Sequence, residues 1–226
     1  MRRKNFLTSM VLIGMLTVGT LAAHSTTIVQ PTAATASTDN GGVRPANAVR
    51  NGSGLSFALA TGDAIPGVYP NHDTDANGMW ASSPGDTVPF ITFDLGAQFN
   101  LSGFHVWNFN QPGFSTVGVR GVNVSFSTTS ATLGFSIPET FIGAGQLTIA
   151  PEAPYPGEDR FFATTHIAQW VRFDVLTNQG NATYFGGLSE VRFFESPPPV
   201  PEPATITLVG LALAGAVGYR RFRRKK

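Results

Sequence analysis

The chain contains no cysteine, and this absence excludes several kinds of stabilisation and chemistry. Without thiols there is no disulfide bond, no thiolate metal centre and no cysteine nucleophile. A folded domain must therefore be stabilised largely by its hydrophobic core. Roughly 155 residues, from 39 to 195, are enough for one such core and too few for two comfortable domains.

Lysine is absent between Lys4 and Lys225. Residues 26–199 contain six arginines and thirteen acidic residues, a formal charge of −7, although the whole chain is formally +1. An acidic body of this kind is a poor partner for nucleic acid or anionic lipid. A neutral glycan, or one reached through a divalent cation, suits it better.

Motifs of known catalytic sites are also missing. The four histidines show no H-E-x-x-H spacing, and no G-x-S-x-G elbow occurs. The adjacent acids Glu158 and Asp159 would point to opposite sides of an extended chain. A glycosidase needs two carboxylates at a set distance, and a non-adjacent pair stays open as an alternative. We expect a protein that is not an enzyme.

Residues 200–226 form three distinct parts. A short proline motif precedes an apolar run over residues 204–219 and a basic cluster over residues 220–226. The basic cluster should stay cytoplasmic and place everything upstream outside. The motif consists of Val200, Pro201, Glu202 and Pro203.

This order resembles the PEP-CTERM sorting signal of Gram-negative, exopolysaccharide-producing bacteria. The resemblance implies transient anchoring in the inner membrane, processing by an exosortase, and then display on or release from the cell surface. The alternative is an ordinary single-pass anchor. Sixteen apolar residues span about 24 Å as a helix, against a hydrocarbon core of about 30 Å, which favours a transient anchor.

The first 25 residues have the pattern of a secretory signal peptide. A basic start at residues 2–4 precedes a largely apolar run over residues 6–23, and small residues follow near Ala23 and Ser25. An uncleaved N-terminal helix is the alternative. Either way, residues 1–25 do not belong to the folded domain.

Composition divides the rest of the chain into three regions. Residues 26–38 are rich in Thr, Ala and Ser, and they predict a flexible lead-in. Residues 39–195 are rich in Gly and Phe and have almost no helical pattern. Residues 196–199 predict a stiff, proline-rich spacer.

Apolar residues alternate with polar ones in the runs 91–95, 122–127, 171–175 and 191–193. A longer run, 99–109, places Phe104 and Val106 on one face and His105 and Trp107 on the other. Turn residues separate these runs. The pattern predicts an all-β fold, an antiparallel β-sandwich.

Five segments occur in an order that resembles a known family: Met79-Trp80-Ala81-Ser82, Ile91-Thr92-Phe93-Asp94-Leu95-Gly96, Phe104-His105-Val106-Trp107-Asn108, Trp170-Val171-Arg172-Phe173 and Gly187-Leu188-Ser189-Glu190-Val191-Arg192-Phe193. They are similar to the discoidin-like, or coagulation-factor C-type, domain. The resemblance covers about residues 40–195 and implies a galactose-binding-like jelly-roll sandwich that recognises carbohydrate or lipid. Residues 128–160 depart from the family's pattern.

Residues 71–78 form a loop dense in oxygen donors. Asp73, Asp75 and Asn77 could direct several oxygens at one point, as Ca²⁺ requires. Pro84 stands where an EF-hand would have its closing Glu. The family resemblance implies a structural Ca²⁺ shared with Glu190, and the alternative is a solvated acidic turn.

A second group of residues has the chemistry of a sugar site. Sugars stack on aromatic rings and receive hydrogen bonds from planar amides and guanidinium groups. Trp107 could instead be a core residue, and Asn108 or Arg120 could tie loops together. The residues expected to bind ligand are Trp107, Asn108, Asn110, Gln111, Arg120 and Asn178, with Gln179 and Asn181 beside the last.

These patterns together predict an exported, exosortase-sorted protein of a Gram-negative cell surface or extracellular matrix. Its β-sandwich is expected to bind carbohydrate, chiefly exopolysaccharide. The alternative is a structural surface or biofilm-matrix protein that makes protein contacts without binding sugar. Nucleic acid is not an expected partner.

Overall fold

The computed structural model describes residues 26–196. The predicted signal peptide, the three prolines of the spacer and the sorting signal lie outside these residues. None of the helices within residues 26–196 is long and apolar enough to cross a membrane. The strands are β1 (Thr27–Val29), β2 (Ala33–Ala36), β3 (Trp80–Ala81), β4 (Phe90–Asn108), β5 (Val119–Ser127), β6 (Glu139–Phe141), β7 (Glu158–Asn178) and β8 (Gly187–Glu195).

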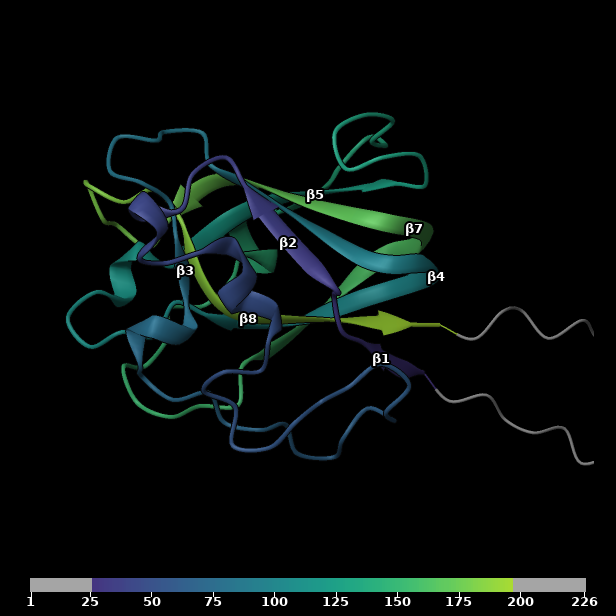
Figure 1. Ribbon diagram of the computed structural model, residues 1–226, viewed down its shortest axis with the longest axis horizontal. Coiled ribbons are helices and arrows are strands. Elements are labelled where there is room, and N and C mark those ends of the chain that lie inside the picture. The colour runs from purple at the N-terminus through teal and green to yellow at the C-terminus, as the bar shows by residue number, and fades with distance from the viewer. Residues whose placement is uncertain (1–25, 197–226) are drawn as a thin grey trace, which may run out of the picture.

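Short 3₁₀ helices make up the remaining regular structure of the described region: η1 (Asn40–Gly42), η2 (Ala46–Arg50), η3 (Ala76–Gly78), η4 (Ser115–Val117) and η5 (Gly143–Gly145). The strands pair in the order β1-β8-β4-β7-β5-β6, with β2 paired to β4 and β3 paired to β8. Every one of these pairings is antiparallel. The predicted all-β antiparallel fold is confirmed (Figure 1).

The two layers of the sandwich come from one sheet that bends, because β4 and β7 are long enough to take part in both. Their register shifts between Asp94 and Phe99 and again between Leu101 and Gly103. A side chain at Gly103 would place its Cβ 2.4 Å from the carbonyl oxygen of Arg160, so only glycine permits this close approach. Bulges of this kind let a strand change direction without losing its partner.

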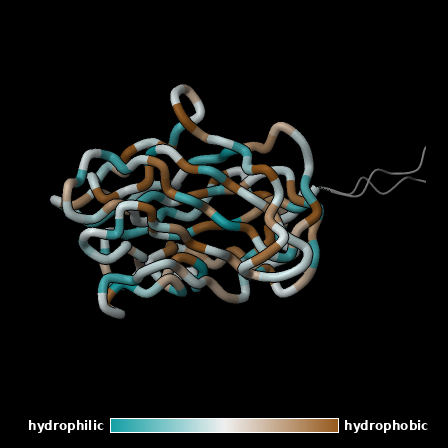
Figure 2. Tube along the Cα trace, turned by 90° about the horizontal axis from the view of Figure 1, so that it is seen from above, coloured by the Kyte–Doolittle hydropathy of each residue, from teal (hydrophilic) through white to brown (hydrophobic). Residues whose placement is uncertain are grey.

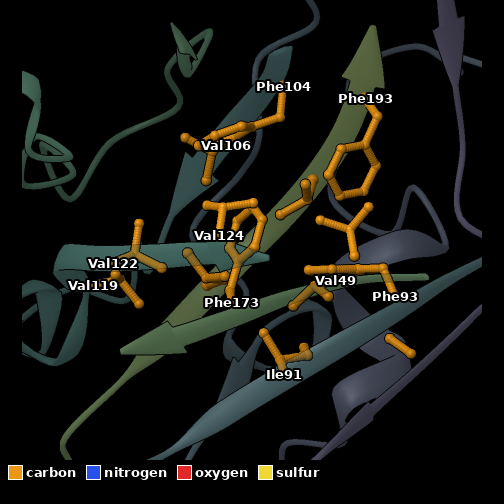
Figure 3. Close-up of a cluster of buried hydrophobic side chains, with 14 of the residues drawn as sticks. Val49, Ile91, Phe93, Phe104, Val106, Val119, Val122, Val124, Phe173 and Phe193 are labelled. Carbon is orange, nitrogen blue, oxygen red and sulfur yellow. The ribbon is translucent and has the colours of Figure 1, made fainter. Parts of the chain in front are cut away.

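The main core lies between the two layers (Figure 3). Phe93, from the first half of β4, meets Phe193 of β8 with ring centroids 5.5 Å apart. Phe104, from the second half of β4, meets Phe173 of β7 at 4.9 Å. Each fully buried phenylalanine contributes roughly 1.5–3 kcal/mol to folding. The alternation of apolar residues correctly predicted this inward face.

Hydrophobic and hydrophilic segments are interspersed along the trace in Figure 2. In β8, however, Arg192 is as buried as its apolar neighbours, with 1% of its surface exposed. The segment 51–71 and the residues around Tyr155 cover this outer face. They form a second, smaller core with Trp107 and Phe194.

The predicted flexible lead-in over residues 26–38 is wrong. Residues 27–29 form β1 against β8, and residues 33–36 form β2 against β4. Ile28 and Val29 are fully buried, and the small side chains of β2 fit a closely packed sheet face. The Thr- and Ala-rich composition reflects strand packing and not flexibility.

The domain has two distinct ends (Figure 1). The described chain begins and finishes at one end, which we call the terminal end, where Thr27 pairs with Glu195. The bends of β4 and β7 lie there as well, since the amide of Ser196 donates to the carbonyl of Asn100. The opposite end, which we call the loop end, carries the loops that follow β2, β4 and β7.

Candidate functional site

A pocket of about 160 Å³ opens at the loop end. Clefts that enclose a drug-sized ligand usually measure about 300–1,000 Å³, so this pocket suits one ring of a ligand that stays largely outside. It is lined by Asn40, Val43, Arg44, Ala81, Phe109, Gln111, Phe114, Val117 and Tyr184. We call it the loop-end pocket.

A left-handed turn positions Arg44 in this pocket. The φ angles of Asn40, Gly41 and Gly42 are 48°, 65° and 81°, a conformation that glycine and asparagine adopt most easily. A carboxylate oxygen of Asp39 accepts a hydrogen bond from the amide of Gly42 at 3.2 Å and closes the turn. The chain then reverses, and the Arg44 side chain lies over the ring of Phe109.

The guanidinium of Arg44 is held from two sides. Its Nη1 donates to the carbonyl of Ala76 at 3.1 Å, and its Nη2 donates to Oε1 of Gln111. The central guanidinium carbon, Cζ, lies 5.1 Å from the centre of the Phe109 ring. Burial lowers the pKa of Arg44, but a guanidinium keeps its charge at any physiological pH. These bonds leave further N–H groups for a ligand.

Aromatic side chains form the walls. Phe109 is 1% exposed and lies at the base, whereas Phe114 is 45% exposed and Tyr184 is half-buried. An exposed aromatic face beside planar donors can hold the C–H face of a sugar and its hydroxyl groups together. The pocket therefore has the chemistry of a small saccharide site.

One residue predicted from the sequence to bind ligand lines this pocket, and another supports it without lining it. Gln111 lines the pocket directly. Asn178 supports it from behind, because its Nδ2 donates to the carbonyls of Asn181 and Tyr184 at 2.7 and 2.8 Å. The second amide loop therefore positions the Tyr184 wall.

Trp107 cannot serve as the predicted sugar platform. Its side chain is fully buried under segment 51–71. Its indole N–H donates to the carbonyl of Pro70 at 3.0 Å. The sequence pattern showed an aromatic residue on the outer face of a strand, but not that a loop covers that face.

Asn108 and Asn110 are buried as well, with 2% and 0% exposure. The amide of Asn108 donates to the carbonyls of Val119 and Thr148, both at 2.7 Å. That of Asn110 donates to the carbonyl of Ala153 at 2.8 Å. Buried amides must find partners, and here the partners are backbone groups of the loops. Both residues brace the loop end and do not face a ligand.

Arg120 lies on the surface of β5 and is not among the residues that line the pocket. Its Nε donates to Oε1 of Gln146 at 2.8 Å. The bond joins β5 to the loop after η5. The structure thus separates Arg120 from Gln111.

Three residues of the predicted calcium site, Asp73, Asp75 and Asn77, lie together in one loop and are joined by hydrogen bonds. Asp75 Oδ1 accepts hydrogen bonds from the backbone and side-chain amides of Asn77, both at 3.0 Å. Asp73 Oδ1 accepts the amide of Asp75 at 2.9 Å. Residues 26–196 contain no group of three His, Asp or Glu side chains placed to share a metal ion.

Glu190 is occupied elsewhere. Its carboxylate accepts a hydrogen bond from Arg192 Nη1 and another, at 2.9 Å, from the amide of Gly52. Both side chains of the pair are at most 1% exposed. Burial raises the pKa of Glu190 to about 7, although Arg192 opposes this shift. The arginine thus supplies the positive charge beside Glu190.

A second hollow, of about 310 Å³, lies where segment 51–71 meets β7. The ring of His105 stacks on Tyr69 at 3.6 Å. Its Nδ1 lies 2.5 Å from a carboxylate oxygen of Asp159, and its Nε2 lies 2.7 Å from the carbonyl of Pro156. Both ring nitrogens are engaged within the protein, so this cluster ties the covering segment to the sheet.

Sequence reasoning missed Arg44, Phe114 and Tyr184. Arg44 was one of six arginines, and its neighbours in the chain gave no aromatic or amide pattern. The one available signal was its place two residues after the Asn-Gly-Gly turn of residues 40–42. The pocket unites three loops that are far apart in the sequence.

Three solved structures illustrate what the chain is similar to. The family 32 CBM from C. perfringens NanJ, solved with galactose, has 13% identity and a TM-score of 0.48, and covers 75% of this chain and 99% of its own. The lectin domain of lectinolysin, solved with Lewis B antigen, has 14% identity and a TM-score of 0.49, and covers 75% and 96%. A chitosan-binding module from Paenibacillus sp. IK-5 has 15% identity and a TM-score of 0.45, and covers 73% and 96%.

No curated protein matches this chain. One family model does match, the PEP-CTERM protein-sorting motif, over residues 199–224. This match includes the Pro201-Glu202-Pro203 motif, the apolar run and most of the basic cluster. The chain therefore carries a PEP-CTERM sorting motif, which implies an exported protein that has a C-terminal membrane-anchoring signal and is processed by an exosortase.

Proposed function

We propose that this is a non-catalytic carbohydrate-binding protein, sorted to the surface or matrix of a Gram-negative cell, that holds extracellular polysaccharide in the loop-end pocket. The observation that carries the proposal is the arrangement of Arg44 and Gln111 beside an exposed aromatic wall. The guanidinium and the amide offer planar donors and acceptors to hydroxyl groups. Phe114 and Tyr184 offer surfaces to the apolar face of a sugar ring.

The charge of the pocket supports a neutral or weakly acidic glycan. Arg44 is the only charged residue among those that line it. The rest of the domain is acidic, so a densely anionic polymer would be repelled before it reached the pocket. Exopolysaccharide with neutral terminal or branching sugars suits both the pocket, with its single arginine, and the acidic surface around it.

Binding without catalysis is supported by the same lining. Hydrolysis of a glycosidic bond needs two carboxylates flanking that bond, and no carboxylate lines the loop-end pocket. The side chains there can orient and retain a sugar. They do not include the pair of carboxylates that most glycosidases use to cleave it.

The position of the pocket suits a protein attached through its C-terminal segment. The described chain leaves the domain after Ser196 at the terminal end, three residues before the sorting motif begins. The loops that line the pocket lie at the other end (Figure 1). Attachment near residue 199 therefore leaves the pocket facing away from the membrane.

The test is retention of the full chain, solubilised in detergent, on immobilised host exopolysaccharide and on a glycan array. We expect Arg44→Ala to weaken retention strongly while the protein stays folded by circular dichroism. Arg120→Ala is the matched control, because it removes an exposed arginine outside the pocket, and it should bind as the unmodified protein does. Equal binding by the two variants would refute the loop-end site.

A structural protein that makes protein contacts is the second candidate. It is favoured by the β5–β6 loop, in which Leu133 is 71% and Ile137 is 90% exposed. Such side chains on a protruding loop suit a protein surface better than a glycan. A folded protein that retains no glycan in the same experiment would favour this candidate.

A further inference from the structure

The three tryptophans of the chain occupy different environments. Trp80 and Trp107 are fully buried, and their indole N–H groups donate to the carbonyls of Thr38 and Pro70 at 2.9 and 3.0 Å. Trp170 lies on the outer face of β7 and is only partly buried. Its N–H has no acceptor within residues 26–196. An indole with an open face and a free donor is suited to bind an amphipathic ligand.

Trp170 borders a pocket of about 110 Å³ that shares no residue with the loop-end pocket. Strand register explains this hollow, because Ala33 of β2 pairs with Asp94 of β4, which pairs in turn with Trp170. The short side chains of β2 leave space beside the large indole. The pocket, which we call the sheet-face pocket, is lined by Ala33, Ala34, Thr35, Thr92, Asp94, Ala131 and Trp170.

Polar groups surround the indole in the positions that a sugar would use. Asp94 Oδ1 accepts hydrogen bonds from the amide of Gly96 at 2.8 Å and from Gln169 Nε2 at 3.3 Å. Its second carboxylate oxygen has no donor within the described residues. The exposed hydroxyl of Thr35 is also without a partner there. A ring stacked on Trp170 could donate its hydroxyl groups to these acceptors.

The charge of this pocket selects among sugars. Asp94 is the only charged residue that lines it. A carboxylate accepts hydrogen bonds from the neutral hydroxyls of a hexose and repels the carboxylate of a uronic acid. Neutral saccharides therefore fit, and polyuronates do not.

We propose that the sheet face around Trp170 is a second saccharide-binding site, selective for neutral sugars, so that one domain contacts glycan at two places. This inference builds on the proposed function but depends on a separate set of residues. Two sites on one rigid body would raise the effective concentration of a long chain at the second site once the first is occupied. Two separate chains could also be bridged.

Trp170 itself provides the readout. Acrylamide quenches exposed tryptophan far more than buried tryptophan, so quenching of the full chain in detergent should report mainly on Trp170. Trp170→Phe should remove most of the quenchable fluorescence, which verifies this assignment. Cellohexaose, maltohexaose and galactohexaose serve as neutral probes, and oligogalacturonate serves as the anionic comparison.

We expect at least one neutral probe to lower the quenching constant, and oligogalacturonate to leave it unchanged. The protection should persist in Arg44→Ala, which separates this site from the loop-end pocket. Calorimetry should show affinity at this site about tenfold weaker in Trp170→Ala, and weaker also in Asp94→Asn, which keeps the shape but replaces an acceptor with a donor.

Protection that disappears in Arg44→Ala, or is absent while the protein still binds glycan, would overturn the second site and leave the loop-end pocket intact. Protection that persists while Arg44→Ala and Arg120→Ala retain glycan equally would support the Trp170 site and refute the loop-end pocket. Asp94→Asn keeps Trp170 and the shape of the pocket, so its weaker affinity preserves the test if Trp170→Ala unfolds.

Discussion

The two ends of the domain are built in different ways. At the loop end, side-chain amides hold several loops by hydrogen bonds to backbone carbonyls, and the result is a fixed pocket around Arg44. At the terminal end, the long strands bend and the described chain begins and finishes. The apolar side chains of Phe161 and Ile167 are 63% and 62% exposed there. One end is braced for recognition, and the other carries the connections to the rest of the chain.

The difference shows that polar residues can be structural where a ligand site needs rigid loops. Asn108, Asn110 and Asn178 resemble ligand-binding residues in composition, yet their amide donors are used by the protein. The residues left free for a ligand are those that these amides position. A site built from loops depends on such bracing to keep its geometry.

The largest expected effect follows from removing one partner of the buried Glu190–Arg192 ion pair. β8 runs between the two ends, and it carries Glu190 and Arg192 fully inside the protein. Replacing Arg192 with alanine leaves the Glu190 carboxylate buried without a counter-charge. Arg192 lowers the pKa of Glu190, so its loss also raises that pKa further, and the substitution should cost about 3–5 kcal/mol of unfolding free energy, measured by denaturant titration.

The control for that experiment is Arg172→Ala, since the partly exposed ion pair of Arg172 with Asp174 is worth about 0–1 kcal/mol. A similar loss in both variants would contradict the special role of the buried pair. Equal retention of glycan by the folded fractions would show that the pair acts through stability alone.

Titration is a milder way to disturb the same pair. Burial raises the pKa of Glu190 from 4.5 to about 7, so between these values the folded state holds a proton that the unfolded chain has released. Unfolding free energy should therefore fall as pH rises through this window. Gln at position 190 cannot ionise, so the unfolding free energy of the unmodified protein should decline relative to that of Glu190→Gln across this pH window. A difference in unfolding free energy that stays constant with pH would contradict the raised pKa of Glu190.

A smaller and more local effect is expected at the loop end. Asn108→Ala leaves the carbonyl of Thr148 without its side-chain donor and that of Val119 with Gln179 alone, which should cost about 1–3 kcal/mol. Glycan affinity should fall as well, although Asn108 does not line the pocket. Asn123→Ala, on the side of β5 that faces Thr140, is the control. Loss of stability with unchanged affinity would mean that the brace does not set the pocket geometry.

The smallest effect is expected from removal of divalent cations. The acidic residues of the loop 73–77 make hydrogen bonds to one another's backbone, and Glu190 is paired with Arg192. Melting temperature should therefore be the same in EDTA and in added Ca²⁺. A rise in melting temperature on adding Ca²⁺ that is lost in Asp75→Asn would support the predicted calcium site.

The inward faces of the long strands were predictable because burial follows their own alternation. Ile91, Phe93 and Leu95 point to the core as their spacing predicts. The outer face was not predictable, because segment 51–71 covers β8 without any periodic pattern of its own. Local patterns report which residues share a face, but not what later packs upon it.

The site was predictable only in part for the same reason. Gln111 was identified from its chemistry, whereas Arg44 contacts Gln111 across 67 positions of sequence. Whether an amide faces a ligand or a carbonyl depends on how distant loops meet. That information is in the tertiary structure and not in the composition of one loop.

The place of β8 in the sheet has a consequence for export. β8 lies between β1 and β4, so the sheet cannot be completed before residues 187–195 are available. In a chain that crosses a membrane from its N-terminus, these residues emerge after the rest of the sheet and immediately before the sorting motif at residues 199–224. Completion of the sheet is thereby delayed until these residues have crossed. The closing of the sheet and the arrival of the sorting signal in the membrane then become successive steps of one event.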